Sequence, residues 1–275
     1  MTTTFTDDPG FEALSQKISR ERGFGCSGYK ERCLRRRIAV RMRARGVHRF
    51  ADYSAVLDGD PLEYERLLDA LTINVTKLFR NWTTYDAMAR LVVPVLWRAG
   101  ARPVRVWSAG CSSGEEPYSL SIALHNAGLA LAGITWEIDA CDLNVERVAR
   151  AQEAVYAESS LRACDADARR KYFVSQPGGF RLRDKYRTGV RVFHANLMAP
   201  NGALGWSVYD AILCRNLLIY VSDDAFATVI GLFARSLLPG GYLFLGHSES
   251  LLDRKTAFAP AMVGGAVVYR KLEAA

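Results

Sequence analysis

Long apolar runs are missing from this 275-residue chain. No stretch reaches the 18 or more uninterrupted apolar residues that a membrane span requires. The polar start MTTTFTDDPG also has no basic-then-apolar signal pattern. We therefore expect a cytoplasmic protein with no membrane insertion. Its composition is that of a folded, soluble chain, since hydrophobic residues make up 49% and charged residues 24%.

Metal-ligand and disulfide patterns are absent as well. The six cysteines have no Cys-x-x-Cys spacing, and a chain of this size does not need disulfide staples. The histidines show no ligand spacing; they are His48, His125, His194 and His247. We therefore expect reduced thiols, no zinc site and no metal cofactor.

The hydrophobic pattern of the sequence changes about one third of the way along the chain. Residues 11 to about 97 have helical patterns, with no strand-length β-branched run between them. After Gly100, short apolar runs alternate with helical segments, which is typical of a mostly parallel sheet built from βαβ units. We predict an all-α N-terminal domain over residues 1–98, including its linker, and an α/β catalytic domain over 99–275. A Pro-Gly-Gly turn between strand-like pieces predicts an inserted antiparallel β-hairpin subdomain over 172–193.

A glycine-bearing turn joins the strand-like run VRVWSA to a helical pattern. Gly110 and Gly114 permit positive φ and the close backbone approach of a nucleotide-like ligand, although a tight turn without a ligand is the alternative. The spacing is not G-x-G-x-x-G and no Lys-Ser/Thr pair follows, so a pyrophosphate is not favoured. Glu115 and Glu116 suit a ligand with ammonium and sulfonium groups, or else they complement the helix dipole.

Asp142 ends the next strand-like run, TWEIDACD. A carboxylate at this point can accept hydrogen bonds from both ribose hydroxyls, with a helix cap as the alternative role. Adenosine without a pyrophosphate, bound beside acidic residues that suit a positive charge, describes S-adenosylmethionine. The sequence therefore predicts an S-adenosylmethionine site.

Arginine is concentrated in one N-terminal segment of a chain whose formal charge is +7. In YKERCLRRRIAVRMRAR an apolar stripe recurs every four residues, while Arg32, Arg36 and Arg43 project from another face. A solvated charged surface is the ordinary alternative. The density of charge favours docking on an acidic partner, but its sign does not distinguish nucleic acid from protein.

Six motifs occur along the chain: LTINVTKLFRNW, RVWSAGCSSGEEPYSL, ACDLN, VFHANL, YDAILCRNLLIY and LFLGHSES. Their order and approximate spacing resemble those of the chemotaxis-receptor glutamate O-methyltransferase (CheR) family. The chain resembles this family over nearly its whole length, and the combination is specific where any one motif would be weak. The departures are small: Leu78 stands where the family usually repeats Phe, and Asn81 replaces a customary acidic residue.

The resemblance implies a class I S-adenosylmethionine methyltransferase fold, Rossmann-like with a mostly parallel sheet. It also implies methyl transfer to glutamates on the cytoplasmic helical bundle of chemoreceptors, with γ-methyl esters and S-adenosylhomocysteine as products. Carried over by motif, the cofactor-lining residues are Asn74, Thr76, Arg80, Glu116, Asp142, Asn196, Leu197, Arg215 and Asn216. The family's use of a basic N-terminal helix makes Arg32, Arg36 and Arg43 the predicted receptor-binding residues. The hairpin is shorter than in members that use it to hold a receptor tether peptide.

Arg80 and Tyr220 are the predicted catalytic residues. A glutamate carboxylate is already an anion at neutral pH, with a reference pKa of about 4.3, so no general base is needed. The Arg80 guanidinium could aim the carboxylate and offset its desolvation, or else form a structural salt bridge. Tyr220 could donate a hydrogen bond to the same carboxylate, with a core position as the alternative.

Two other functions remain as alternatives. A nucleic-acid methyltransferase would fit the charge, but no proline is followed by proline or cysteine, so the motifs for amino-group and pyrimidine methylation are missing. The presence of Arg80, Asp142, Asn216 and Tyr220 counts against the other alternative, a non-catalytic S-adenosylmethionine-binding adaptor. We therefore expect a monomeric enzyme with no nucleic-acid partner, recruited from the cytoplasm to membrane-associated receptor arrays.

Overall fold

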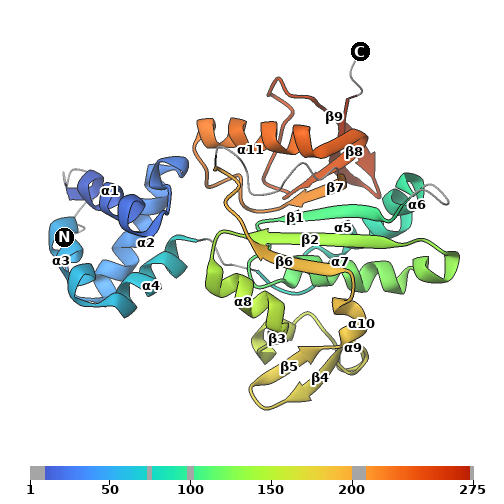
Figure 1. Cartoon of the computed structure of the whole chain (residues 1–275), viewed down its shortest axis with the longest axis horizontal. Helices are drawn as coiled ribbons and strands as arrows, with labels where there is room; N and C mark the ends of the chain where they lie inside the picture. Colours follow the sequence, from blue (N-terminus) through green and yellow to red (C-terminus); the bar gives the residue numbers. More distant parts are fainter. Residues whose placement is uncertain (1–9, 73–75, 98–101, 200–208, 273–275) are drawn as a thin grey trace. The chain divides into compact units, whose positions relative to one another are not determined.

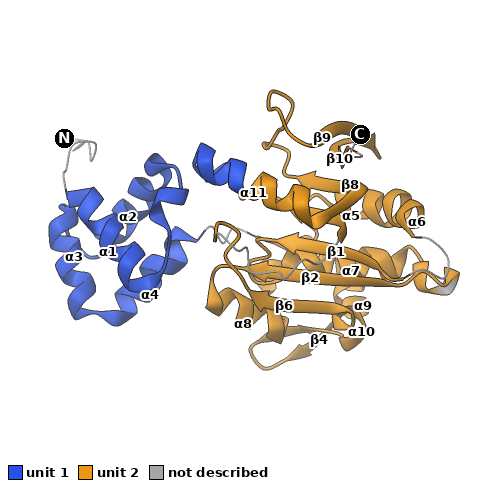
Figure 2. Cartoon of the chain, turned by 45° about the horizontal axis from the view of Figure 1, so that its top comes forward, with its two compact units in different colours: residues 1–74, 219–228 blue, residues 75–218, 229–275 orange. Residues whose placement is uncertain are grey.

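The computed structural model describes residues 10–72, 76–97, 102–199 and 209–272 (Figure 1). The chain divides into two compact units, residues 1–74 with 219–228 and residues 75–218 with 229–275 (Figure 2). The division falls at residue 74, earlier than the expected residue 98. The reason is that the helical segment beginning at Trp82 packs into the core of the second unit.

Helices make up nearly all of the first unit. They are α1 (Gly10–Arg22), η1 (Cys26–Gly28), α2 (Glu31–Ala44), α3 (Phe50–Gly59) and α4 (Pro61–Leu71). The predicted stripe of α2 is buried: Leu34, Ile38 and Met42 all lie in the core. Asp60 caps α4 by accepting the Glu63 N–H at 3.0 Å, and Pro61 occupies the first turn. The expected all-α N-terminal region is confirmed.

A segment from much later in the chain completes the first unit. The Lys30 N–H donates to the Tyr220 carbonyl at 2.8 Å, and the Ser222 N–H donates to the Gly28 carbonyl at 2.9 Å. Tyr29 and Val221 form an isolated antiparallel bridge between these two bonds. The start of α11 (Asp223–Ser236), as far as Thr228, is grouped with the same unit.

The second unit is built on a seven-stranded sheet of order β6-β2-β1-β7-β8-β10-β9. Its strands are β1 (Val104–Ala109), β2 (Trp136–Asp142), β6 (Val190–His194), β7 (Tyr209–Cys214), β8 (Leu237–Leu245), β9 (Phe258–Val263) and β10 (Ala266–Lys271). The pairs that link β6, β2, β1, β7 and β8 are parallel, whereas β10 is antiparallel to both its neighbours. The predicted mostly parallel sheet is confirmed.

Strand order reverses at β1, which lies between β2 and β7. The chain passes from β1 through α7 (Glu115–Asn126), β2 and α8 (Val145–Glu153) towards β6, and it later resumes at β7 on the other side of β1. In open α/β sheets, ligands bind at the carboxyl ends of the strands beside such a reversal. The ends of β1, β2 and β7 are therefore where a site is expected.

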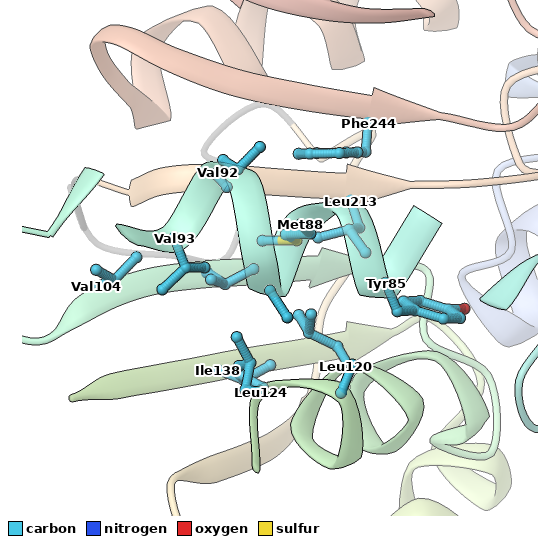
Figure 3. Packing of buried hydrophobic residues seen from close by; sticks show 14 of the residues in the cluster. Tyr85, Met88, Val92, Val93, Val104, Leu120, Leu124, Ile138, Leu213 and Phe244 are labelled. Atoms are coloured by element: carbon cyan, nitrogen blue, oxygen red, sulfur yellow. The ribbon is translucent and has the colours of Figure 1, made fainter. Parts of the chain in front are cut away.

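A helical segment before β1 supplies part of the hydrophobic core of the second unit. It consists of α5 (Trp82–Ala87), the π-helical η2 (Met88–Val92) and α6 (Val93–Leu96). Buried side chains from this segment pack with others from α7 and the central strands (Figure 3). Tyr85, Met88 and Val92 contribute to this cluster together with Leu120 and Leu213. The short η3 (Leu129–Ala132) follows α7, and no described helix is long and apolar enough to cross a membrane.

A separate three-stranded antiparallel sheet, of order β3-β5-β4, is inserted between α8 and β6. Its elements are β3 (Val155–Tyr156), η4 (Glu158–Leu161), α9 (Ala166–Tyr172), β4 (Phe173–Gln176), β5 (Gly179–Leu182) and α10 (Asp184–Arg187). The β4–β5 pair confirms the predicted hairpin, but β3 lies outside the expected 172–193. A Cβ at Gly179 would lie 2.5 Å from the Tyr156 carbonyl oxygen, so this close pairing requires glycine.

Candidate active site

The turn between β1 and α7 has positive φ values, which glycine adopts readily. Gly110, Ser112 and Gly114 have φ values of 84°, 49° and 90°. A Cβ on Gly114 would lie 2.8 Å from a ring carbon of Tyr118 and 3.0 Å from the Ala151 Cβ, so a side chain would not fit. The N–H groups of Gly110 and Cys111 both donate to the Cys141 carbonyl at 2.9 Å, which holds the turn against the end of β2.

Asp142 joins this turn to the end of β2. One carboxylate oxygen accepts the Ser112 N–H at 2.7 Å, and the other accepts the Asn144 N–H at 2.9 Å. Burial raises the pKa of Asp142 above its ordinary value, although these two donors oppose the rise. The N-cap of α8 is Asn144, which accepts the Arg147 N–H. Each Asp142 oxygen has a further lone pair, so the half-buried carboxylate can still accept bonds from a ligand's hydroxyls.

The two glutamates that begin α7 have different surroundings. Glu116 accepts the Ser108 hydroxyl at 2.8 Å, and its other oxygen lies 3.6 Å from Arg215 Nη1. Burial raises the pKa of Glu116, and the Arg215 cation opposes that rise. Glu115 accepts the Ser113 hydroxyl at 2.8 Å and so is tied to its own turn. Glu116 is thus the glutamate that belongs to the polar cluster below.

Arg80 lies between two residues with left-handed backbone, Phe79 at φ 59° and Asn81 at φ 56°. Asparagine tolerates this conformation, whereas a bulky residue such as phenylalanine rarely adopts it. The Phe79 N–H donates to the Ser119 hydroxyl at 2.8 Å, and its ring packs edge-on against Trp82 at 5.2 Å. These contacts, with the fully buried Leu78, hold a strained turn of the kind that occurs at functional sites.

Arg215 connects this turn to the ends of the central strands. It follows β7 and is only 5% exposed. Its Nη1 donates to the Tyr85 hydroxyl at 2.8 Å and to the Arg80 carbonyl at 3.3 Å. Burial raises the pKa of both Glu116 and Tyr85, and the Arg215 and Arg80 cations oppose the rise. We refer to Arg80, Tyr85, Glu116 and Arg215 as the arginine cluster.

Glu249 shapes the turn that follows β7. Its buried carboxylate accepts the N–H groups of Asn216 at 2.8 Å, Leu218 at 2.7 Å and Gly246 at 2.6 Å. Asn216 has φ 64°, and a Cβ on Gly246 would lie 2.7 Å from a Glu249 oxygen. Sequence reasoning assigned no role to Glu249, Ser108 or Tyr85. The only signal for Glu249 was its place in the GHSE motif.

The other predicted residues are distributed as follows. Asn196 follows β6, where its side chain accepts the Met198 N–H at 2.9 Å; the neighbouring Leu197 is buried. Thr76 is half-buried, and Asn74 lies outside the described residues. Tyr220 belongs to the first unit, where the Arg37 guanidinium lies 5.6 Å from its ring centroid.

Two buried polar atoms in the site have no hydrogen-bond partner among the described residues. They are the Ser112 hydroxyl oxygen and Arg215 Nε. Four atoms elsewhere on the chain share this property, those of Ser15, Arg37, Arg169 and Arg187, so it does not by itself mark a ligand site. The Asp142 carboxylate suits ligand hydroxyls, and Glu116 suits a cationic group. Within the described ranges, no group of three or more His, Cys, Asp or Glu side chains could hold a metal ion.

The six arginines of α2 form two groups, of which the first has partners within the first unit and includes Arg37, which donates to the Ala70 carbonyl at 2.8 Å. Arg35 lies 2.6 Å from Glu31, and Arg41 donates to the fully buried Glu63 at 3.0 and 2.6 Å. The members of the second group are exposed and form no ion pair with any described residue; they are Arg32, Arg36 and Arg43. Val40, which is 50% exposed, lies on the same helix face. We refer to these three arginines and Val40 as the α2 surface.

Known proteins match this chain along most of its length. The all-alpha domain of CheR methyltransferases matches residues 9–72, and their SAM-binding domain matches residues 74–264. The chemotaxis protein methyltransferase of Klebsiella aerogenes is 33% identical over 88% of this chain and 83% of that protein. Its counterpart in Salmonella typhimurium is 30% identical over 95% of this chain and 90% of that protein. The probable biofilm formation methyltransferase WspC of Pseudomonas aeruginosa is 32% identical over 90% of this chain, which spans only 59% of that protein's length.

Proposed function

Because the chain belongs to the CheR methyltransferase family, whose catalytic domain binds S-adenosylmethionine, we propose that it methylates glutamate side chains on the cytoplasmic helices of a chemoreceptor. The products are the glutamate γ-methyl ester and S-adenosylhomocysteine. The observation that carries this proposal is the arginine cluster at the reversal of the sheet, beside Asp142. Two relatives named as chemotaxis protein methyltransferases support it.

The cofactor is held by the residues at the ends of the central strands. Asp142 accepts hydrogen bonds from the ribose hydroxyls, and Glu116 lies where a carboxylate offsets a cationic group. The other residues of the site are Asn74, Thr76, Arg80, Asn196, Leu197, Arg215 and Asn216. When bound, S-adenosylmethionine supplies an electrophilic methyl group on a sulfonium.

Arg80 positions the substrate carboxylate. A guanidinium can hold both carboxylate oxygens in a fixed plane, and its charge offsets part of the cost of removing the anion from water. Arg80 must orient this group more than bind it tightly, since the negative charge disappears as the ester forms. The strained backbone on each side of Arg80 supports this role, because it fixes where the side chain leaves the turn. Tyr220 is proposed as a second hydrogen-bond donor to the carboxylate.

The α2 surface is the proposed docking site for the receptor. Its three arginines are not neutralised by any described acidic residue, so their charge is available to an acidic partner. Receptors that control motility and receptors that control biofilm formation are both substrates to test, because the relatives carry both kinds of name.

Labelling with a radioactive methyl group tests the proposed function directly. The purified protein is incubated with labelled S-adenosylmethionine and either receptor-containing membranes or nucleic acid. We expect label in the receptor band, released as methanol in base, which is the behaviour of a carboxyl methyl ester. Label in nucleic acid would support the alternative methyltransferase instead. Cofactor binding without transfer to any acceptor would support the adaptor.

Asp142→Ala is expected to weaken S-adenosylmethionine and S-adenosylhomocysteine alike, because both carry the ribose. The loss should be roughly 1–3 kcal/mol, measured by calorimetry. Asp165→Ala is the matched control, since Asp165 also accepts a backbone N–H, that of Ala168 at 2.7 Å, but caps α9 in the inserted segment. Equal affinities for the wild type and Asp142→Ala would remove Asp142 from the cofactor site.

A further inference from the structure

Tyr85 has an apolar environment and one polar contact. Its side chain is 1% exposed and packs in the core cluster that contains Met88, Ala89 and Leu120. The hydroxyl lies at the end of the ring directed away from the other labelled residues of that cluster (Figure 3). There it accepts Arg215 Nη1 at 2.8 Å, while the Arg215 guanidinium carbon lies 5.3 Å from the ring centroid.

Packing alone does not require this hydroxyl. A phenylalanine would fill the same apolar space, and burial of a phenolic oxygen is unfavourable unless it forms a hydrogen bond. Burial raises the pKa of Tyr85, so the group is neutral and can accept a bond from a cation. Any stabilisation that the hydroxyl provides must therefore come from its hydrogen bond with Arg215.

Arg215 depends on Tyr85 more than on its other partners. Of the polar contacts that the described residues make with Arg215, the bond to Tyr85 is the shortest. The Arg80 carbonyl lies at 3.3 Å, and the nearest Glu116 oxygen lies at 3.6 Å, which is beyond ordinary hydrogen-bond length. Without the hydroxyl, a buried guanidinium would have no strong side-chain hydrogen bond to fix its orientation.

The same nitrogen of Arg215 contacts both the Tyr85 hydroxyl and the backbone of Arg80. Tyr85 follows the strained turn of Arg80 by one helical turn, so its side chain and that turn are held together through Arg215. We propose that Tyr85 is a positioning residue whose hydroxyl fixes the Arg215 guanidinium between Glu116 and the Arg80 turn. Tyr85 thereby aligns the cofactor side of the site with the residue that orients the substrate. This inference rests on the proposed function.

Tyr85→Phe tests the hydroxyl because the variant removes one oxygen and keeps the ring. The single-turnover rate of methyl transfer, at saturating receptor and cofactor, should fall about tenfold or more. The affinity for S-adenosylhomocysteine should also fall several-fold. Tyr209→Phe is the matched control, because Tyr209 is equally buried and donates to Asp139 at 2.7 Å outside the arginine cluster. That variant should lose comparable thermal stability and keep the wild-type rate and affinity.

A double-mutant cycle separates positioning from a general loss of stability. Arg215→Lys removes the guanidinium that Tyr85 contacts, so adding Tyr85→Phe to it should cause little further loss of rate or affinity. The inference is overturned if Tyr85→Phe stays within about twofold of the wild type in both measurements, or if its effects simply add to those of Arg215→Lys. Failure of the proposed function would instead appear as an inactive wild type. In that case the cycle on S-adenosylhomocysteine affinity, which needs no acceptor, still decides the role of Tyr85.

Discussion

Arg80→Ala is expected to abolish methylation of the receptor, with a loss of at least about a hundredfold in the single-turnover rate. The substrate glutamate would lose the group that orients its oxygen while its desolvation would cost the same. The fold should survive, because Leu78 and Phe79 anchor the turn independently of the Arg80 side chain. Thermal unfolding of the variant checks that expectation.

Arg80→Lys distinguishes orientation from charge. Lysine restores the positive charge but not the planar pair of donors, so the rate should recover little. Arg80 is also a proposed cofactor residue, so affinity for S-adenosylhomocysteine must be measured alongside the rate. If Arg80→Ala keeps a near-normal single-turnover rate at saturating receptor and cofactor, the proposed mechanism is wrong. Full rescue by lysine would leave charge neutralisation as the role of Arg80.

Reversing the charges of the α2 surface is the second variant with a large expected effect. Replacement of Arg32, Arg36 and Arg43 by Glu should raise the receptor KM about tenfold or more and flatten its dependence on salt. Cofactor affinity should not change, since the three side chains are exposed on the first unit, whereas Glu116 and Asp142 lie in the second. KM measured at several ionic strengths tests this expectation.

A control with the same change in net charge is available elsewhere on the chain. Arg150, Arg162 and Arg235 are also exposed, and reversal of all three alters the overall charge equally. If the control triple raises KM as much as the α2 triple, general repulsion explains the effect. If the α2 triple has wild-type parameters at low salt, the α2 surface is only a solvated face.

The fold class and family could be predicted because they depend on patterns within short segments. The alternation of apolar runs with helical segments predicted the parallel sheet, which the structure confirms. The combination of motifs predicted the CheR family, which the matches to both of its domains confirm. The residue boundaries of the two units and of the inserted sheet were harder to predict from the sequence. The helices from Trp82 to Leu96 have an apolar face like those of the first unit, and nothing in their periodicity says that they pack against β1. The two residues of β3 are too few to show a strand period.

The contacts within the candidate site were beyond sequence reasoning for a different reason. Glu249 and Asn216 are distant in sequence, and their bond depends on how the sheet brings two loops together. Tyr85 occupies a position that helical periodicity explains as core, so its hydroxyl carried no separate signal. The left-handed backbone of Phe79 is also invisible in the sequence, because most phenylalanines avoid it.

The first compact unit does not correspond to one uninterrupted stretch of the gene. The strand-like stretch around Val221 pairs with the residues around Tyr29, yet the two are encoded on opposite sides of most of the catalytic unit. Recombination at residue 74 would separate the helices from this second segment. A chimera that replaces only residues 1–74 would therefore lack the second piece of this unit, residues 219–228. The two pieces of the helical unit lie on either side of residues 75–218. A single continuous stretch that carries the whole helical unit must therefore also carry this part of the second unit.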